Sequence, residues 1–499
     1  MNPDTRLPGA RSRHSETEPS RAGRCSRSPP GLPMWNQLFS SCPNAGHAIE
    51  TTVGDVLRGI SVAVFSILLI AGCSDSRLEE QPRPNILLIS IDALRADHLS
   101  CYGYERPTTP FLDELAVSGT RFSSAFVNTH GTPPSHTTML SSLYQESHRV
   151  GFGAGTPEGR NDRVPADVEM VQEILQRAGW QTLAVTGGGY MAAIFGFDRG
   201  FDVFQGGAPA IEDGTRMLLS QLENLPPKPV FAMLHTYQVH SPYQPPEAYA
   251  ALWDTYESDL VPTNEHLKPI QRTAGEILTD DDFRHLEALY DGEIRFTDDV
   301  LRGFFAQLED MGFLDNCLVI ITSDHGEEFG DHGGLLHSAS LYDELLRVPL
   351  IISGTGALAA NEETRLVSLI DLAPTILAAA GLPIPEIMEG SDLLDGSQPP
   401  SLERQRIFAQ YTDLLYGIRT PRWKLIQAPK NGHIQLFDLE ADPRELRNVA
   451  TRRATVTEGL LGELEAWKKA SADRVSRMST QPELTPEKIE ELQALGYTQ

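Results

Sequence analysis

Short apolar segments that alternate with helical patterns constrain the fold of this chain more than any other feature. The clearest is Asn85–Ile91, an unbroken Ile/Leu-rich run that is typical of a strand buried on both faces. Further strands are expected at residues 180–185, 230–234, 318–322 and 348–353. Apolar residues at helical spacing separate them, at residues 109–119, 166–179, 294–312 and 371–381. This alternation predicts a doubly wound α/β fold, with a mostly parallel sheet flanked by helices.

Chemistry-bearing side chains follow three of these strands. Asp92 follows the first, His235 and His240 follow the third, and Asp324 and His325 follow the fourth. In open α/β sheets, ligands bind beyond the carboxyl ends of the strands. We therefore expect these side chains to converge at one edge of the sheet, with His235 packed beneath the site.

A hydroxyl nucleophile is expected on a rigid loop at Thr132, which precedes two prolines. Threonine is a weak nucleophile, and a divalent ion that touches its oxygen lowers the cost of forming the alkoxide. A mixed set of oxygen and imidazole ligands favours Mn or Zn over Ca. We expect one divalent ion (Mn, Zn or Ca), held by Asp92, Asp324, His325 and Thr132.

Three further histidines are candidate catalytic residues beside Thr132. Imidazoles at His136, His240 and His337 can donate to a substrate anion, and one of them can protonate the leaving oxygen. The competing interpretation is structural, because a threonine before prolines is common in loops and an Asp-His pair after a strand is often a helix cap.

The charge of the chain restricts its partners. The net charge is −27 over 499 residues, which opposes binding of nucleic acid. A small anionic ester or a glycan remains compatible, because a bound metal reverses the field locally.

The N-terminal region predicts export. Residues 59–72 form one apolar run that is short for a membrane span and fits the core of a signal peptide. The run ends at Cys73 in a segment that resembles a bacterial lipoprotein processing site, which implies cleavage before Cys73 and acylation of its thiol. An ordinary secretory signal is the alternative. We expect a protein of the bacterial cell envelope, anchored by lipid as a periplasmic or outer-membrane lipoprotein.

The domain organisation follows from composition. Residues 1–72 are expected to be a leader and signal peptide. The Arg/Ser/Pro-rich part of this leader is expected to be disordered or to lie upstream of the true start. Residues 73–83 are expected to form a lipid-anchored tether. Residues 84–395 are expected as the catalytic domain. A polar Gly/Pro-containing stretch then precedes a small α+β domain at residues 404–499, with strand patterns at 406–410, 423–427 and 434–439 and a final helix from 456.

From about Pro84 onward the chain resembles the sulfatase family, within the wider alkaline phosphatase superfamily. The segments that carry the resemblance are PNILLISIDALRADHLSCYGY, TTPFLDELAVSGTRFSSAF, YDGEIRFTDDVL, VIITSDHGEEFGDHG, LYDELLRVPLII, VSLIDLAPTILAAAGL and LFDLEADPRELRNVA. The resemblance implies the doubly wound fold, a divalent metal at the carboxyl edge of the sheet and a small C-terminal sheet.

The chain departs from the family pattern at the nucleophile. Family sulfatases carry Cys or Ser in a C/S-x-P-x-R pattern and oxidise it to formylglycine, whereas this chain has Thr132 there and His136 in place of the arginine. Threonine cannot become formylglycine. The family lysine before an L-Y-E-E segment is replaced by His337.

Two other departures concern anion and metal binding. The family's G-K-x-H segment is replaced by Gly187-Gly188-Gly189-Tyr190, whose backbone amides we expect to form an anion cradle instead. The usual Asp-Asp pair is Asp92-Ala93, so one metal carboxylate is missing.

The T-x-P-x-H pattern resembles the nucleotide pyrophosphatase/phosphodiesterase branch of the superfamily, in which threonine attacks phosphorus. That branch holds a second zinc with a D-x-x-x-H pair, whereas Thr236 stands four residues before His240, so a second metal is not expected. We therefore expect a metal-dependent hydrolase of sulfate or phosphate esters, in which Thr132 attacks a phospho(di)ester and forms a covalent threonine intermediate. The alternatives are a true sulfatase, a phospho-group transferase acting on envelope glycans, and a non-catalytic binding lipoprotein.

Overall fold

The computed structural model describes residues 83–151, 163–223, 225–358, 362–395 and 405–478. The predicted leader, signal peptide and acylated Cys73 lie outside the described residues. Within the described part, no helix is long and apolar enough to cross a membrane. Cys101 and Cys317 are both free thiols.

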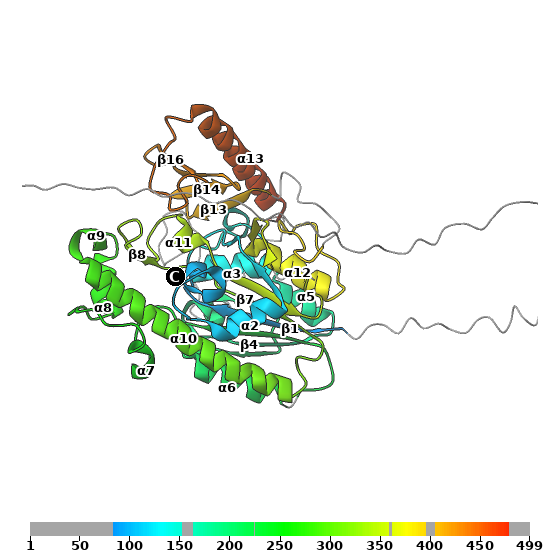
Figure 1. Cartoon of the computed structure of the whole chain (residues 1–499). Coiled ribbons are helices and arrows are strands. Elements are labelled where there is room, and N and C mark those ends of the chain that lie inside the picture. Colours follow the sequence, from blue (N-terminus) through cyan, green and yellow to red (C-terminus); the bar gives the residue numbers. More distant parts are fainter. Residues whose placement is uncertain (1–82, 152–162, 224, 359–361, 396–404, 479–499) are drawn as a thin grey trace, which may run out of the picture. The chain divides into compact units, whose positions relative to one another are not determined.

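An eight-stranded sheet forms the centre of the larger domain (Figure 1). Its strands are β1 (Asn85–Ile91), β2 (Thr120–Phe122), β4 (Gln181–Val185), β5 (Val203–Gln205), β6 (Val230–Thr236), β7 (Cys317–Thr322), β10 (Leu350–Gly354) and β11 (Glu362–Glu363). They lie in the order β11-β2-β10-β7-β1-β6-β4-β5. β1 pairs in parallel with both β6 and β7, while β10 runs antiparallel to β7 and β2. The predicted mostly parallel sheet is confirmed.

Helices cover both faces of this sheet, because β1 is apolar on both. Leu87 and Ile89 belong to the core beneath α2 (Pro110–Ser118), α6 (Ile211–Leu222) and α10 (Asp280–Asp310). Ile86 and Leu88 face the opposite core, beneath α3 (Thr132–Ser141), α5 (Val171–Arg177) and α12 (Leu372–Ala379). Figure 1 shows α6 and α10 on one side of the sheet and α3, α5 and α12 on the other.

The predicted helix at 294–312 is the later part of a longer one. α10 begins at Asp280, where Thr279 accepts a hydrogen bond from the Asp282 amide in a capping box. Its first turn is acidic, but buried apolar residues at helical spacing, such as Leu286 and Tyr290, already occur in its first half, and the predicted range left them out. The Thr279 capping box sets the start of α10, and the apolar spacing gave no sign of it.

Short elements connect the long ones and carry several residues of the site. These are η1 (Ala96–His98), η2 (Ser100–Tyr102), β3 (Ala125–Phe126), α4 (Gln145–His148), η3 (Gly189–Met191), η4 (Ala193–Phe195), α7 (Glu247–Ala250), α8 (Asn264–Leu267), η5 (Lys268–Ile270), α9 (Ala274–Ile277), β8 (Glu328–Phe329), β9 (Leu335–Leu336), α11 (Asp343–Leu346), β12 (Val367–Ser368) and η6 (Leu369–Asp371).

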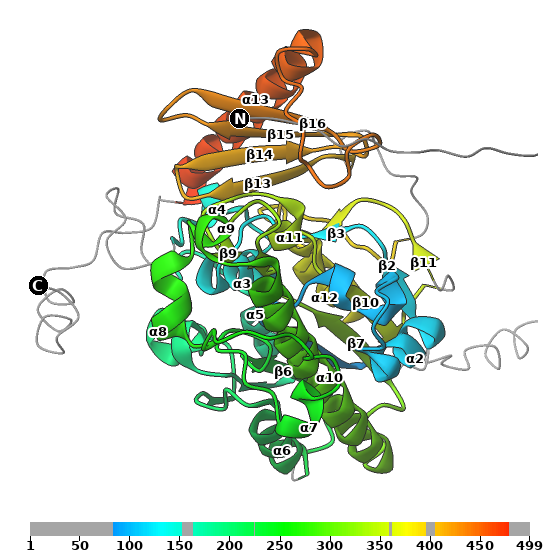
Figure 2. The same cartoon turned by 60° about the vertical axis from the view of Figure 1, so that its left-hand side comes forward.

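A four-stranded antiparallel sheet forms the small C-terminal domain (Figure 2). Its strands are β13 (Ile407–Tyr411), β14 (Leu415–Arg419), β15 (Trp423–Ala428) and β16 (His433–Asp438), and it packs against α13 (Ala454–Met478) through Leu460, Leu464 and Trp467. The predicted small sheet with a final helix is confirmed. β14 was not among the predicted strands, because its short LYGIR segment contains a glycine and lacks strict alternation.

Candidate active site

Three predicted metal ligands meet at the carboxyl ends of β1 and β7. Asp92 follows β1, and Asp324 and His325 follow β7, so the parallel pairing of these strands brings them together. Each offers one ligand atom, all within 4.8 Å of one another, and all three side chains are fully buried. Glycine is required next, since a Cβ on Gly326 would lie 1.9 Å from the Glu344 carbonyl oxygen.

The ligand atoms of this cluster lack hydrogen-bond partners among the described residues. They are Oδ1 of Asp92, Oδ2 of Asp324 and Nε2 of His325, all buried. His325 Nδ1 donates to the Gly326 carbonyl at 2.8 Å, which leaves Nε2 with its lone pair toward the carboxylates. Buried polar atoms are normally satisfied, so three orphaned acceptors that converge on one point fit a divalent cation.

The electrostatics of the cluster agree with this fit. Burial and the charge of Asp92 raise the pKa of Asp324 to about 7. Burial would also raise the pKa of Asp92, but the hydrogen bond from His235 and the nearby His325 hold that pKa well below its usual range. Without a cation, the negative charge of Asp92 therefore opposes ionisation of Asp324. A bound divalent cation would stabilise both carboxylates in the ionised form.

Ala93, which stands where the family carries a second acid, contributes its backbone. Its amide donates to Asp324 Oδ1 at 3.3 Å, and its φ of 61° lies in the left-handed region. The Tyr290 hydroxyl donates to its carbonyl at 2.8 Å. The turn after Asp92 is thereby tied to Asp324, although the site holds one carboxylate fewer than the family pattern implies.

Thr132 begins α3 instead of lying on the predicted loop. Pro133 and Pro134 occupy the first turn, where a missing N–H costs no helical hydrogen bond. The Thr132 hydroxyl donates to Asp92 Oδ2 at 3.1 Å, and the side chain is only 4% exposed. The predicted nucleophile therefore lies directly beside the metal-ligand cluster, at the positive end of a helix.

His136 is not placed for its predicted contact with substrate. It is fully buried, its Nδ1 donates to the Thr132 carbonyl at 2.9 Å and its Nε2 accepts from the Ser90 hydroxyl at 2.9 Å. Burial and the neighbouring His235 lower the pKa of His136 to about 3, so it is neutral. His136 supports α3 from below because its helical position turns it toward β1.

His235 lies beneath the site, as expected. Its Nε2 donates to Asp92 Oδ2 at 3.3 Å, while its Nδ1 accepts from the Gly187 amide at 3.3 Å. It therefore orients the carboxylate without facing the cavity.

The substrate cavity opens above Thr132 and has a volume of about 600 Å³. His240 and His337, two of the predicted catalytic histidines, both line it, with ring centroids 5.1 Å apart. His337 Nδ1 donates to Glu327 Oε1 at 3.1 Å, and Glu327 also accepts from the Tyr243 hydroxyl at 2.9 Å. Glu327 is a positioning residue that sequence reasoning missed, although it stands two residues after His325.

Two of the three backbone amides that were predicted to form an anion cradle, in the glycine segment 187–189, bond within the protein. The Gly187 amide donates to His235 and the Gly188 amide donates to Thr186 Oγ1 at 3.3 Å, so neither points at a ligand. A Cβ on Gly187 would lie 2.5 Å from Cδ2 of Tyr237. Glycine is thus needed here because the Tyr237 ring packs against the backbone at the cavity wall.

Four residues that sequence reasoning missed also line the cavity: Tyr237, Lys268, Arg272 and Tyr411. Tyr411 comes from β13 of the small domain and stacks on His130 with ring centroids 4.4 Å apart. The C-terminal sheet therefore completes the wall of the site. No sequence pattern signals these contacts, because the four residues lie on segments far apart in the chain.

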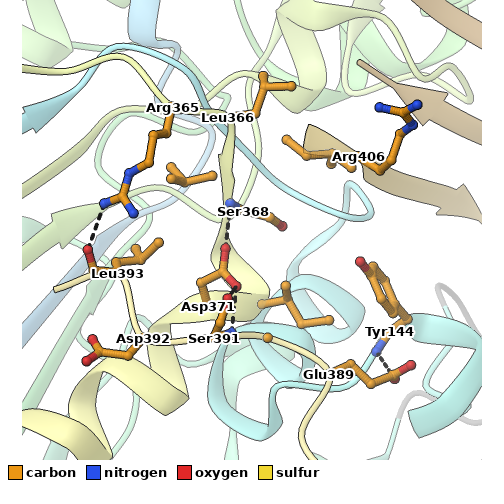
Figure 3. Close-up of a pocket in the computed structure, with 14 residues that line it drawn as sticks. Tyr144, Arg365, Leu366, Ser368, Asp371, Glu389, Ser391, Asp392, Leu393 and Arg406 are labelled. Atoms are coloured by element: carbon orange, nitrogen blue, oxygen red, sulfur yellow. Dashed lines mark hydrogen bonds between the residues drawn. The ribbon is translucent and has the colours of Figure 1, made fainter. Parts of the chain in front are cut away.

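A second cavity, of about 290 Å³, lies between the β12–η6 segment and β13 of the small sheet (Figure 3). Its polar groups bond within the protein: Arg365 donates to the Leu393 carbonyl, Asp371 accepts from the Ser368 and Ser391 amides, and Glu389 accepts from the Tyr144 amide. These bonds join segments within the larger domain. The groups serve the structure, and the cavity over Thr132 is the one that contains the reactive side chains.

Comparison with known proteins identifies similar sequences and folds. The sulfatase family profile matches residues 84–382, and the profile of the N-sulphoglucosamine sulphohydrolase C-terminal region matches residues 330–470. The chain is 25% identical over 488 residues to an N-acetylglucosamine-6-O-sulfatase of Bacteroides thetaiotaomicron, covering 77% of this chain and 86% of that protein.

Two solved structures share the fold. One is a complex with its substrate D-glucosamine-2-N,6-O-disulfate, with a TM-score of 0.65, 21% identity and coverage of 80% of this chain and 100% of the other. The other is a phosphonate monoester hydrolase of Agrobacterium radiobacter, with a TM-score of 0.62, 23% identity and coverage of 78% and 96%. At these identities the structural likeness shows the fold alone.

Proposed function

Because this chain belongs to the sulfatase family and is a hydrolase of ester bonds, we propose that it cleaves a phosphate monoester or diester by direct attack of Thr132. The observation that carries the proposal is the position of the Thr132 hydroxyl, 3.1 Å from Asp92 Oδ2 and beside three converging orphaned ligand atoms. A threonine cannot supply the formylglycine hydrate of the family sulfatases, so the nucleophile is the hydroxyl itself.

The cluster of Asp92, Asp324 and His325 would hold a divalent ion next to Thr132. When bound, the ion lowers the pKa of the hydroxyl and neutralises the oxygens of the transferred group. An imidazole ligand with two carboxylates suits Zn or Mn better than Ca. One such ion is proposed, because the structure brings these three ligands together in one cluster.

The reaction proceeds in two displacements. In the first, the bond from Thr132 Oγ1 to phosphorus forms, the bond to the leaving oxygen breaks, and the hydroxyl proton passes toward Asp92 Oδ2. The leaving oxygen takes a proton from His337, whose cation is stabilised by Glu327. In the second displacement, neutral His337 takes a proton from a water molecule, whose oxygen attacks phosphorus. The bond from phosphorus to Thr132 Oγ1 then breaks, and Oγ1 takes its proton back from Asp92 Oδ2.

Sulfate esters form the second candidate substrate class, since the relatives named above are sulfatases. The two classes are separated by assaying metal-loaded protein on nitrophenyl esters of four kinds: a sulfate, a phosphate monoester, a phosphodiester and a phosphonate. Phosphoester turnover that falls at least about a thousandfold in Thr132→Ala, with a phosphothreonine trapped in the wild type, supports the proposal. Sulfate turnover that persists in Thr132→Ala would refute it, and absence of turnover on every ester would favour a transferase or a binding protein.

We further propose that the protein acts in the bacterial cell envelope, anchored through acylated Cys73. The support is the apolar run at residues 59–72 that ends at this cysteine. Labelling with a fatty-acid analogue and membrane fractionation test it. Label and membrane association should both disappear in Cys73→Ala, and an unlabelled, soluble wild type would refute the anchor.

A further inference from the structure

Two cations line the substrate cavity without a role in the reaction above. Lys268 lies on η5 and Arg272 follows one helical turn later, and both side chains are exposed. None of the described residues that line this cavity is an aspartate or glutamate, although the chain carries a net charge of −27. In the described part of the chain, no carboxylate forms an ion pair with either cation.

This lack of partners differs from the pattern elsewhere in the structure. Arg95, Arg106 and Lys424, for example, each lie within 3.0 Å of a carboxylate oxygen. In an acidic protein, two adjacent cations facing a cavity free of acids create a local positive field there. The field extends over the site into which an anionic substrate must enter.

The segment that carries the two cations is fastened to the catalytic loops. Leu267 and Ala274 are fully buried and anchor it from below. The Ser241 hydroxyl, next to His240, donates to Asn264 Oδ1 at 2.8 Å. The Leu335 amide, two residues before His337, donates to the Gln271 carbonyl at 2.8 Å. Lys268 and Arg272 are therefore held in place relative to the two cavity histidines.

We propose that Lys268 and Arg272 bind a second negative charge, carried by the leaving group of the substrate. The inference rests on the proposed function, in which the transferred group lies at Thr132. A cavity of about 600 Å³ has room for a further ring beside that group. Tyr190 and Tyr411 also line it, and aromatic side chains pack favourably against a ring of this kind. The substrate class is thus an ester whose leaving group is an anionic sugar or arene, bearing a carboxylate, sulfate or phosphate.

A matched pair of substrates tests this assignment. Phenyl phosphate and 3-carboxyphenyl phosphate differ in the carboxylate of the leaving group, and the corresponding sulfates serve if sulfate is the group transferred. The wild type should prefer the carboxylated ester in kcat/KM. Lys268→Ala and Arg272→Ala should each lose about fivefold on that ester alone, as expected for an exposed ion pair. Lys268→Glu should reverse the preference.

Controls separate this local effect from the overall charge of the protein. Lys469→Ala and Arg284→Ala remove exposed cations that pair with acids on α13 and α10, and both should keep the wild-type preference. Raising the salt from about 0.1 M to about 1 M shortens the Debye length from about 10 Å to about 3 Å and should reduce the preference.

The outcomes are distinct from those that test Thr132. If the alanine variants lose kcat/KM equally on both esters, the cations contact the transferred group and the assignment is overturned. An unchanged preference in the variant that carries both Lys268→Ala and Arg272→Ala would also overturn it. If the wild type cleaves neither ester, the proposed function fails, and calorimetry with 3-hydroxybenzoate still decides the subsite. Binding that is lost in the double variant supports the subsite, and equal binding overturns it.

Discussion

Replacement of Asp324 by asparagine should stabilise the metal-free protein while weakening its response to metal. Asp324 and Asp92 are buried together with His325, and the pKa of Asp324 is raised to about 7 from 3.8 by burial and by the Asp92 charge. A carboxyl group whose pKa is raised on folding supports stability below its unfolded pKa and loses that support as the pH rises to the folded value. Asparagine keeps the acceptor for the Ala93 amide and removes the charge.

The size of the effect follows from the shift. A rise of about 3 pKa units corresponds to about 4 kcal/mol at pH 8, where the ionised side chain is fully destabilising. At pH 5 the same term is about 2 kcal/mol. The described part of the chain has roughly 400 residues, so its unfolding entropy is about 0.8 kcal/mol per kelvin. The variant should therefore melt about 5 °C above the wild type at pH 8 in EDTA, and about 2 °C above it at pH 5.

Thermal melts with and without Zn or Mn measure both halves of the prediction. Metal at a hundred times its Kd should raise the wild-type melting temperature by about 3 °C, and the variant should respond less. Asp259→Asn, an exposed carboxyl outside the site, is the control and should change little. A variant that melts below the wild type in EDTA at pH 8, or a difference that is the same at both pH values, would refute the reasoning.

Two further perturbations address the cavity wall and the acid-base group. Gly187→Ala places a Cβ 2.5 Å from the Tyr237 ring and should lower the free energy of unfolding by about 1–3 kcal/mol. Gly303→Ala is the control, because Gly303 is an exposed residue of α10 whose added Cβ would have no atom within 4 Å, and it should raise the free energy of unfolding by up to about 1 kcal/mol. Similar melting temperatures for the two variants would contradict the contact with Tyr237. Burial lowers the pKa of His337, and the Glu327 carboxylate opposes that shift. Glu327→Gln removes this opposition, so the alkaline limb of the kcat profile should move to lower pH, with about a tenfold loss of rate. An unshifted profile would contradict the role of Glu327.

The sequence determined the central sheet and the metal-ligand cluster. An apolar run such as Asn85–Ile91 can only be buried on both faces, and its length and composition identify it as a strand. Since parallel strands end at the same edge, Asp92, Asp324 and His325 had to meet once β1 and β7 were neighbours. Local pattern and strand direction were sufficient for this part of the site.

Only the tertiary structure decided how the cavity is lined and which histidines face it. His136 turns away because α3 begins at Thr132, and that start depends on Gly131 and on packing against β1. Lys268 and Arg272 reach the cavity from a segment with no periodic pattern, held by the buried anchors Leu267 and Ala274. Tyr411 ends β13, a strand that the sequence predicted, but it reaches the cavity only because the small sheet packs there. Periodicity records which residues of one element share a face, whereas contacts between elements depend on the packing of the whole chain.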